Sequence, residues 1–533
     1  MSCKNNNFLE TSISSDLALK IIQCLNVVDS GELASVSRRY YYLVHQYRRL
    51  RGPELATTSS SANGIDSIRQ VVKDCKQKVQ SKPNLLLHFT ATSMTDFSVT
   101  KPLSFGSETV GLGVVSPQEI QVCQPGQNGS QGKIDDDSND SLMAMNFPGA
   151  TVLPFSIDHT AGNLDFDFLE QRLKYHNKSG DDKFWKAVIL YATGGSADAV
   201  IVRLQKFMPN AAIVGGVCLE GHVSIPEFTK EELGSMSIKH LRYLSSKHMP
   251  FKKIMPGIIE KSDLVDHIFD TLKTKQFVID SSGSYERVIG LDSAFGVFLG
   301  GDVPVRSVVS RGVQSLLNSK GSPQPFSDLV VHETCLSKPG TEDYLFGKNG
   351  PPVHLISKIE DKTSGNLYSP MEVFGKYSSS NLHQAQYLGF KRKGHDGFEL
   401  SEMNNMAMQQ LDTFVIVSDG SMASDESLKG AEIDFFMFNG KSCMDDMDRT
   451  MSMLREQTEG EEILGALMYT CCARGPSNSG LIPERMSDAT RFAKGFPDVP
   501  CLGFYANGEF GPLALAGNEN VFQTGRAMHQ GVS

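Results

Sequence analysis

Long apolar runs, paired cysteines and secretory signals are all missing from this sequence. No run of about 18 apolar residues could span a bilayer, and Met1 is followed by polar residues instead of the apolar stretch of a signal peptide. The ten cysteines are scattered, and none belongs to a Cys-x-x-Cys pair, so neither a disulfide framework nor a zinc ribbon is indicated. We therefore expect a protein of the cytosol or the nucleus, two compartments that the sequence does not separate.

Catalytic and metal-binding motifs are missing as well. The chain contains no His-Glu-x-x-His, Gly-x-Ser-x-Gly, EF-hand, dinucleotide-binding or P-loop pattern. Its 13 histidines are dispersed, and no pair of them stands at metal-ligand spacing beside a cysteine. The sequence therefore predicts no active site of its own, no metal and no cofactor.

The net charge bears on the partners that the chain can bind, and its length bears on the number of domains. Acidic residues outnumber basic ones by 61 to 51, which leaves a formal net charge of -10. Nucleic-acid binding relies on neutralising phosphates with Lys and Arg, so we expect no nucleic-acid partner, and we expect no membrane partner. At 533 residues the chain exceeds one hydrophobic core, and two or three domains are expected.

Short apolar runs that end at glycine or turn residues alternate with amphipathic segments beyond Ile65. The expected strands are 85–91, 110–115, 187–191, 211–217, 296–299, 353–359, 414–417, 435–438, 463–469 and 501–505. The expected helices are 65–80, 166–176, 198–207, 444–457 and 488–496. This order predicts an α/β (or α+β) body of mixed sheets with helices, in two parts.

Three polar segments interrupt this pattern. Residues 53–64 contain a run of Thr and Ser, residues 124–141 are rich in Gly, Asn, Asp and Ser, and residues 318–326 carry glycine and proline. Such compositions bury too little apolar surface to offset the entropy lost on ordering. We interpret the first as a linker, the second as an insertion within a domain, and the third as the boundary between the two parts of the body.

Two apolar stripes indicate helices in the first 50 residues. Ser14 or Ser15 can cap the first helix. The stripes consist of Leu17, Ile21, Ile22 and Leu25, and then of Leu33, Val36, Tyr40 and Leu43. A helical module this small gains stability when it buries its remaining apolar surface on a partner.

This segment resembles an F-box, whose usual pattern is Leu-Pro-x-Asp-Leu, then Ile-Leu, then Leu-x-x-Val-Ser-Lys/Arg-x-Trp. The chain departs from it by serine in place of the proline and by Tyr40 in place of the tryptophan. The resemblance implies an F-box over residues 8–52 that binds the Skp adaptor of a cullin–RING ubiquitin ligase through the eight apolar residues above. The alternative is a plain helical cap packed on the body.

Glycine-based motifs characterise the rest of the chain. Cys471-Cys472-Ala473-Arg474-Gly475 and Gly503-Phe504-Tyr505-Ala506-Asn507-Gly508-Glu509-Phe510-Gly511-Pro512 resemble the carboxy-terminal FIST domain, and Val214-Gly215-Gly216 resembles the amino-terminal one. The resemblance implies an amino-terminal FIST domain at 65–317, a carboxy-terminal FIST domain at 327–517 and a tail at 518–533. Bacterial FIST domains are proposed to sense small ligands such as amino acids, whereas in the F-box group the same body is expected to recognise a protein destined for ubiquitination.

If a ligand pocket persists in this body, the polar residues to examine are Cys472, Arg474, Asn507 and Glu509. Arginine and glutamate would suit the carboxylate and ammonium of an amino acid. In the alternative, Arg474 pairs with Glu509 to fix two strand ends and Asn507-Gly508 is a hairpin turn. An apolar strand context also predicts that Cys471 and Cys472 are buried and inert.

These patterns predict a non-catalytic receptor of a ubiquitin ligase. Its F-box would bind the Skp adaptor and the cullin–RING scaffold, and its FIST body would hold a target protein for ubiquitination and proteasomal degradation. The alternatives are a sensor of a small amino-acid-like ligand and an enzyme that acts on a small molecule in the glycine-rich body. Neither the target nor the ligand can be named from the sequence.

Overall fold

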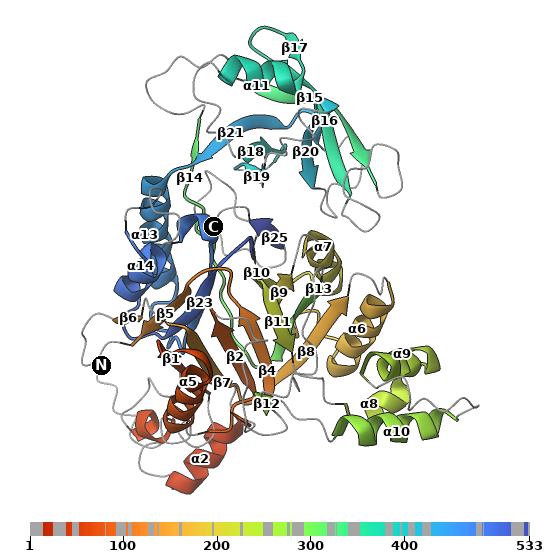
Figure 1. Cartoon of the computed structure of the whole chain (residues 1–533), viewed down its shortest axis with the longest axis vertical. Coiled ribbons are helices and arrows are strands. Elements are labelled where there is room, and N and C mark those ends of the chain that lie inside the picture. The colour runs from red at the N-terminus through yellow and green to blue at the C-terminus, as the bar shows by residue number, and fades with distance from the viewer. Residues whose placement is uncertain are drawn as a thin grey trace, which may run out of the picture.

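The computed structural model consists of several packed sheets with helices on their outer faces (Figure 1). It describes residues 14–24, 33, 39–44, 53–79, 81–91, 103–104, 109–125, 133–135, 138–158, 163–193, 197–223, 228–248, 260–273, 278–279, 293–316, 326, 328–338, 352–378, 387–394, 397–402, 411–417, 428–475, 482, 484–512 and 527–530. The mixed α/β fold class expected from the sequence is confirmed. Among these residues no helix is long and apolar enough to cross a membrane.

The first sheet follows the amino-terminal helices. Its strands, in spatial order, are β1 (Glu54–Ser60), β7 (Asp140–Asn146), β2 (Leu85–Thr90), β4 (Val110–Val115) and β11 (Glu220–Val223). Only β2 and β4 run parallel; the other neighbours are antiparallel. Helix α5 (Gly64–Lys78) covers one face of this sheet, because Ile68, Val71 and Val72 recur at helical spacing and pack against the strands.

The second sheet faces the first across the main core of the molecule. Its strands are β25 (Ala527–Gln530), β24 (Glu509–Pro512), β10 (Ala212–Val217), β9 (Trp185–Thr193), β13 (Ser293–Gly301) and β8 (Ala150–Asp158). Alternate residues of β9 point to opposite faces. Ile189 and Tyr191 join the core shared with the first sheet, whereas Val188 and Leu190 pack on α6 (Asn163–His176) and α7 (Ala197–Phe207).

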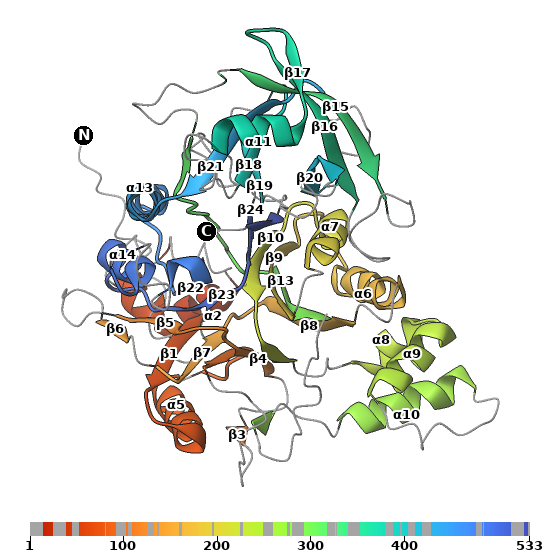
Figure 2. The same cartoon turned by 45° about the horizontal axis from the view of Figure 1, so that its top comes forward.

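Three short helices pack beside α6 and form a helical lobe at the edge of the molecule (Figure 2). They are α8 (Lys230–Ser235), α9 (Ile238–His248) and α10 (Lys261–Lys273). A buried ion pair ties the lobe to α6: Arg172 Nε donates to Glu232 Oε1 at 2.7 Å, and its guanidinium lies 4.2 Å from the ring centre of Phe228.

The third sheet joins segments that lie far apart in the sequence. Its strands are β22 (Ala466–Cys471), β23 (Cys501–Ala506), β5 (Ile120–Gln124) and β6 (Lys133–Asp135). Helices α13 (Gly440–Gln457) and α14 (Ser487–Gly495) pack side by side on it, through Met447, Met451 and Phe492 (Figures 1 and 2).

The fourth sheet forms a separate lobe, the upper lobe, above the body (Figure 1). Its strands are β17 (Asn366–Tyr368), β16 (Val353–Asp361), β15 (Leu329–Ser337), β21 (Glu432–Phe438), β18 (Tyr387–Lys391) and β19 (Glu399–Glu402), with β20 (Phe414–Val417) on β16 and β14 (Val313–Ser315) on β21. Helix α11 (Pro370–Ser378) packs on this sheet through Val373. Two further strands, β3 (Leu103–Ser104) and β12 (Val278–Ile279), pair with each other.

Strands from both sides of the expected boundary near residue 318 share sheets. Strand β23 pairs with β5, and β24 pairs with β10. Both neighbours of β10 require glycine in it: a Cβ on Gly215, whose φ is +146°, would lie 1.7 Å from the carbonyl oxygen of Leu190 on β9, and a Cβ on Gly216 would lie 2.7 Å from the Cβ of Ala506. Gly216 thus permits close packing between the two parts of the chain, whereas Gly215 permits the close approach of β10 to β9.

The interpretation of residues 53–64 as a linker requires correction. Strand β1 occupies Glu54–Ser60 and pairs with β7 along its whole length. Thr57 and Thr58 are buried, and Thr58 Oγ1 donates to the carbonyl oxygen of Val71 at 2.9 Å. Threonine has a high strand propensity, and its hydroxyl can be satisfied by backbone, so a polar run of this kind can still be buried.

The other two polar segments have different outcomes. The expected insertion 124–141 contains β6 and the start of β7, so strand pairing begins inside it. Of the expected boundary 318–326, only Phe326 is among the described residues. All ten expected strands and all five expected helices are confirmed, with ends that shift by a few residues.

Helix α13 begins at Gly440, four residues before the expected start, because Asn439 caps it. Asn439 Oδ1 accepts a hydrogen bond from the Ser442 N–H at 3.1 Å. We expect Asn439→Ala to lower the free energy of unfolding by about 1 kcal/mol. Urea denaturation followed by the fluorescence of Trp185, the sole tryptophan, measures this loss. Asn439→Asp keeps the acceptor, and an equal loss in that variant would contradict the capping role.

Candidate functional site

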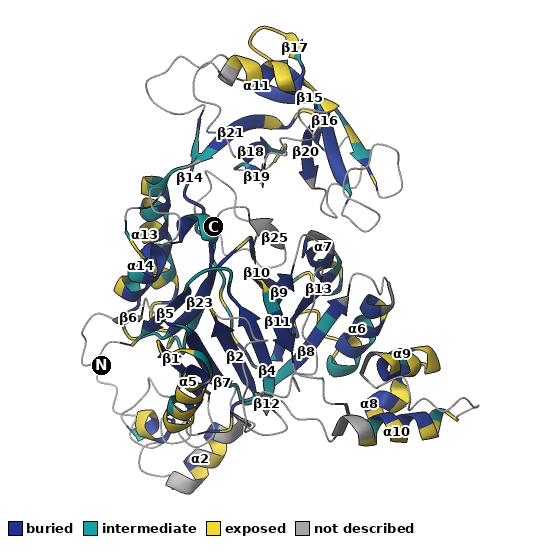
Figure 3. Cartoon of the chain, in the orientation of Figure 1, coloured by how far each residue is buried: buried dark blue, intermediate teal, exposed yellow. Residues whose placement is uncertain are grey.

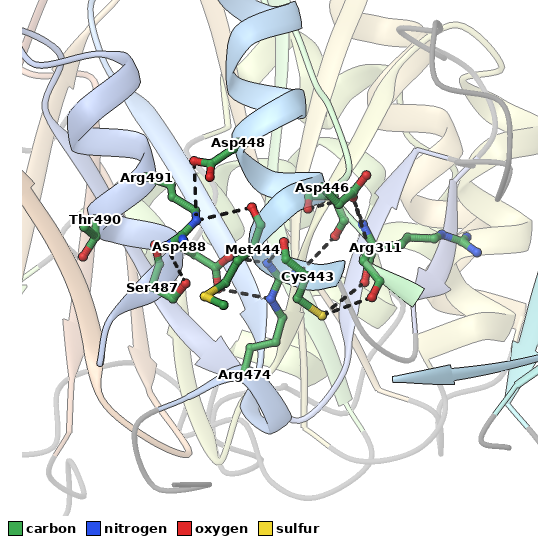
Figure 4. Close-up of polar contacts among 12 residues, drawn as sticks. Arg311, Cys443, Met444, Asp446, Asp448, Arg474, Ser487, Asp488, Thr490 and Arg491 are labelled. Carbon is green, nitrogen blue, oxygen red and sulfur yellow. Dashed lines mark hydrogen bonds and ion pairs between the residues drawn. The ribbon is translucent and has the colours of Figure 1, made fainter. Parts of the chain in front are cut away.

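The Cys-x-x-Arg-Gly motif lies where β22 ends and a short 3-10 helix, η6 (Cys472–Arg474), begins. Cys471 closes the strand, and its Sγ accepts a hydrogen bond from the Ala473 N–H at 3.4 Å. The Gly475 N–H then donates to the Cys472 carbonyl oxygen at 3.0 Å. This tight turn sends the Arg474 side chain into the interior between α13 and α14 (Figure 4).

Arg474 and Asp488 form a fully buried ion pair. The Nε of Arg474 donates to Asp488 Oδ2 at 3.2 Å, and its Nη2 donates to the other carboxylate oxygen. The remaining donors reach backbone carbonyls: Nη1 that of Ser310 at 3.3 Å and Nη2 that of Cys443 at 3.5 Å. Burial alone would lower the pKa of Arg474, but the charge of Asp488 raises it above its usual range.

Asp446 of α13 holds the segment that leads into the upper lobe. Its Oδ2 accepts hydrogen bonds from the Ser310 hydroxyl at 2.9 Å, from the Arg311 N–H at 2.8 Å and from the Gly312 N–H at 3.2 Å. Gly312 has a φ of +62°, and a Cβ there would lie 2.2 Å from the Cα of Cys443. Residues 310–312 are therefore clamped between Asp446 and Arg474.

Arg311, within this segment, is itself buried, and burial lowers the pKa of its guanidinium to about 10. The surrounding charges of Glu399 and Asp446 oppose that effect. These contacts form a polar clamp that contains two buried arginines, Arg311 and Arg474.

A second arginine ties α14 to α13. Arg491 donates to Glu484, to the Ser487 hydroxyl at 2.9 Å and to the Met444 carbonyl oxygen at 3.3 Å, and it lies 3.5 Å from Asp448 (Figure 4). With the Arg474 pair, it fixes the positions of both helices against the end of β22.

The glycine of the motif is required by its neighbours. A Cβ on Gly475 would lie 2.3 Å from Gln118 Oε1 and 3.2 Å from the Tyr505 ring. Tyr505 is buried, and no described residue hydrogen-bonds its hydroxyl or the Oε1 of Gln118. Gln118 Oε1 beside this glycine, and the Tyr505 hydroxyl at the far end of the ring, therefore have unused hydrogen-bonding capacity.

The four candidate ligand residues are not gathered in one arrangement. The guanidinium of Arg474 is occupied by Asp488, so the suggested pairing of Arg474 with Glu509 is wrong. Glu509 is buried near Cys471, whose pKa its charge helps to raise. Asn507 is exposed at the bend where the chain passes from β23 in one sheet to β24 in another. That bend is no hairpin, because the two strands pair with different neighbours.

Sequence reasoning missed Asp446 and Asp488, which carry the clamp. Asp446 is the third residue of the helix expected at 444–457, where an acidic side chain suits the helix dipole, but the earlier start of α13 places it in the second turn. Asp488 lies in the first turn of α14, where an acidic residue also suits the helix dipole. The favourable interaction of acidic side chains with a helix N-terminus therefore accounts for both carboxylates, and nothing in the local sequence indicates their long-range partners. Among the described residues, no group of three or more His, Cys, Asp or Glu side chains could hold a metal ion.

The amino-terminal residues divide into an inner and an outer set. In α2 (Ser15–Cys24), Ala18 and Ile22 pack against Tyr40, Leu43 and Val44, with Leu33 partly buried beside them. Leu17 is 51% exposed and Ile21 is 41% exposed, so these two occupy the outer side of the helix. Figure 3 shows that α2 carries both buried and exposed positions. Leu25 and Val36 lie outside the described residues.

Comparison with known protein families identifies one part of the chain. Residues 407–512 match the model described as the FIST C domain. This range contains α13, the Cys-x-x-Arg-Gly turn, α14, β23 and β24, and thus most of the clamp. No curated protein matches the chain. The chain therefore carries a FIST C domain over residues 407–512.

Proposed function

We propose that this protein is the substrate receptor of a Skp–cullin–RING ubiquitin ligase. The observation that carries the proposal is the outer side of α2, where Leu17 and Ile21 stay exposed one helical turn apart. Large apolar side chains at that spacing form the stripe that a partner can bury. The resemblance of this segment to an F-box makes the Skp adaptor the partner.

The FIST C domain and the sheets around it would then hold the target protein. The clamp supports this role because it fixes the segment that leads into the upper lobe on the body, through Asp446 and Arg474. The target would lie near the ubiquitin donor only if receptor and scaffold form a rigid assembly. The protein itself would contribute proximity and no bond-making step.

Leu17→Asp is expected to abolish co-purification of the full-length protein with the Skp adaptor and cullin. A charge at the centre of an apolar contact removes buried area and leaves an unpaired carboxylate. Leu219→Asp is the matched control, because Leu219 is 52% exposed at a site distant in sequence. We expect it to bind like wild type.

Circular dichroism of both variants checks that they are folded. Failure of the wild-type protein to capture the adaptor would overturn the proposal. Equal capture by Leu17→Asp and wild type would show that the outer side of α2 is not the docking surface.

A sensor of a small ligand is the second candidate function. It is favoured by the FIST C domain and by two buried atoms that no described residue hydrogen-bonds, Gln118 Oε1 beside Gly475 and the Tyr505 hydroxyl. A ligand that binds only the folded state raises the thermal midpoint of unfolding. Thermal scans with each amino acid in excess, on wild type and Tyr505→Phe, distinguish the two functions, because a receptor without a ligand site gives no shift in either protein.

A further inference from the structure

The buried side chain of Gln121, on β5, has no hydrogen-bonding partner among the described residues. It is 0% exposed, and both its amide oxygen and its amide nitrogen are unsatisfied there. Ile120 and Val122 point into the main core, so Gln121 points to the opposite face of the third sheet. Cys123 shares that face, and its Sγ donates to the Ala489 carbonyl oxygen at 3.5 Å, which places α14 over this part of β5.

The hydroxyl of Tyr505 is a second unsatisfied group on this face. Gly503 of β23 lies opposite Gln121 in the strand register, so Tyr505, two residues further along β23, is the diagonal neighbour of Gln121. Long and aromatic side chains at diagonal positions of one sheet face lie within reach of each other. Tyr505 is fully buried, and no described residue hydrogen-bonds its hydroxyl. Gly503 itself contributes no side chain between them.

The start of α14 packs over these residues without a side-chain cap. Met486, the residue before the helix, has a φ of +53°, and its side chain caps none of the first backbone N–H groups. Ser487 and Asp488, the first two residues of α14, are both buried. The free N–H groups of a buried helix start are normally satisfied by a side chain, by water or by a ligand. Three polar features that require a partner therefore lie along the interface between α14 and the β5–β23 pair.

The charges at this interface favour an uncharged partner. The carboxylate of Asp488 is already balanced by Arg474, so an anion would meet negative charge without a free cation to hold it. A carboxylate ligand, such as that of a free amino acid, is disfavoured for the same reason. Burial, and then the charge of Asp488, raise the pKa of Tyr505 above its usual range, so its hydroxyl keeps its proton and can donate.

We propose that the interface between α14 and the β5–β23 pair binds a small uncharged molecule that carries a primary carboxamide. Gln121 pairs with this group through two hydrogen bonds, because each amide supplies an N–H donor and a carbonyl acceptor. The Tyr505 hydroxyl donates to the second lone pair of the ligand oxygen. This inference rests on the sensor function, whose ligand class it names, and it is independent of adaptor docking.

Saturation-transfer NMR of the full-length protein, with acetamide and acetate in one sample, tests the ligand class. The two molecules are nearly equal in size, but acetate is an anion and has no N–H donor. The methyl signal of acetamide is expected to show transfer from the wild-type protein, and that of acetate none. Equal signals from the two molecules, or no acetamide signal because the site holds water only, would overturn the proposal.

Substitution of Gln121 tests the location of the site. Gln121→Leu is expected to weaken acetamide binding about tenfold, since it removes two hydrogen bonds and keeps a similar side-chain volume. Tyr505→Phe, which removes one hydrogen bond, is expected to weaken it less. Gln70→Leu is the matched control and is expected to bind like wild type, because Gln70 is exposed on α5 and its amide donates to Asp74.

Equal acetamide binding by Gln121→Leu and wild type would place the ligand elsewhere and overturn the site. If Gln121→Leu does not fold, Tyr505→Phe decides the location in its place. An amino acid that raises the thermal midpoint, together with no acetamide signal, would keep the sensor function and overturn the carboxamide site. An acetamide signal that Gln121→Leu loses, with no shift from any amino acid, would support the site although the amino-acid sensor fails.

Discussion

Arg474→Met is expected to lower the free energy of unfolding by about 3–5 kcal/mol, because it leaves the carboxylate of Asp488 buried without its partner. Both side chains are at most 2% exposed, so water cannot replace the lost contact. The substitution also removes the donors that reach the carbonyl oxygens of Ser310 and Cys443. Urea denaturation monitored by Trp185 fluorescence measures the loss.

The exposed pair between Arg306 and Glu461 offers a matched control. These side chains are 47% and 46% exposed, and an ion pair in water contributes at most about 1 kcal/mol. Arg306→Met should therefore cost far less than Arg474→Met. Comparable losses in the two variants would contradict the structural role of the Arg474–Asp488 pair.

A double substitution tests the physical origin of the loss. Much of the cost of breaking a buried pair comes from the charge that remains, and apolar replacement of both partners can be nearly neutral. Arg474→Met combined with Asp488→Leu is therefore expected to recover part of the stability lost in Arg474→Met. A loss equal to the sum of the two single losses would show that the partners do not interact.

The clamp also shows what the sequence could and could not predict. The turn at Cys472 to Gly475 was recognisable, because its residue pattern is local. The partner of Arg474 was not, since Asp488 lies 14 residues further along and its place in a first helical turn offers a complete local explanation. Long-range electrostatic pairs leave no periodic signal in a sequence.

The strands illustrate the same division. Apolar runs such as Leu85–Thr90 were predicted because both of their faces are buried. Strand β1 was missed because its Thr and Ser side chains resemble a linker, and only its pairing with β7, 80 or more residues away, makes it a strand. The split of the F-box-like residues into an inner and an outer set likewise needed the packing of Ile22 against Tyr40.

His222 is expected to make the protein sensitive to acid. It lies on β11, in register with Gly113 of β4, which is in turn in register with His88 of β2. His88 Nε2 lies 3.0 Å from Asp140 Oδ1, and all three polar side chains are at most 2% exposed. Burial, and then the charge of His88 on the same sheet, lower the pKa of His222 to about 4.

When the pKa of a histidine is lower in the folded than in the unfolded protein, the folded state is favoured as long as the histidine is uncharged. Its contribution is complete above the unfolded pKa of about 6.5 and is lost as the pH falls towards 4, because the unfolded chain then binds the proton more readily. A shift of that size corresponds to about 3 kcal/mol between pH 7 and pH 4. The acidic residues at neighbouring strand positions are Asp140 of β7 and Glu220 of β11. Both are present in the wild type and in the His222→Gln variant.

His222→Gln is therefore expected to flatten the decline in unfolding free energy between pH 6.5 and pH 4, whatever its stability at pH 7. Urea denaturation at a series of pH values gives the slope, and hydrogen exchange of peptides that span β4 and β11 localises it. His332→Gln is the control, because His332 is 46% exposed and its replacement should leave the slope unchanged. An acid slope in His222→Gln equal to that of wild type would show that His222 is not the group responsible, since its buried imidazole can cost stability only by taking up a proton.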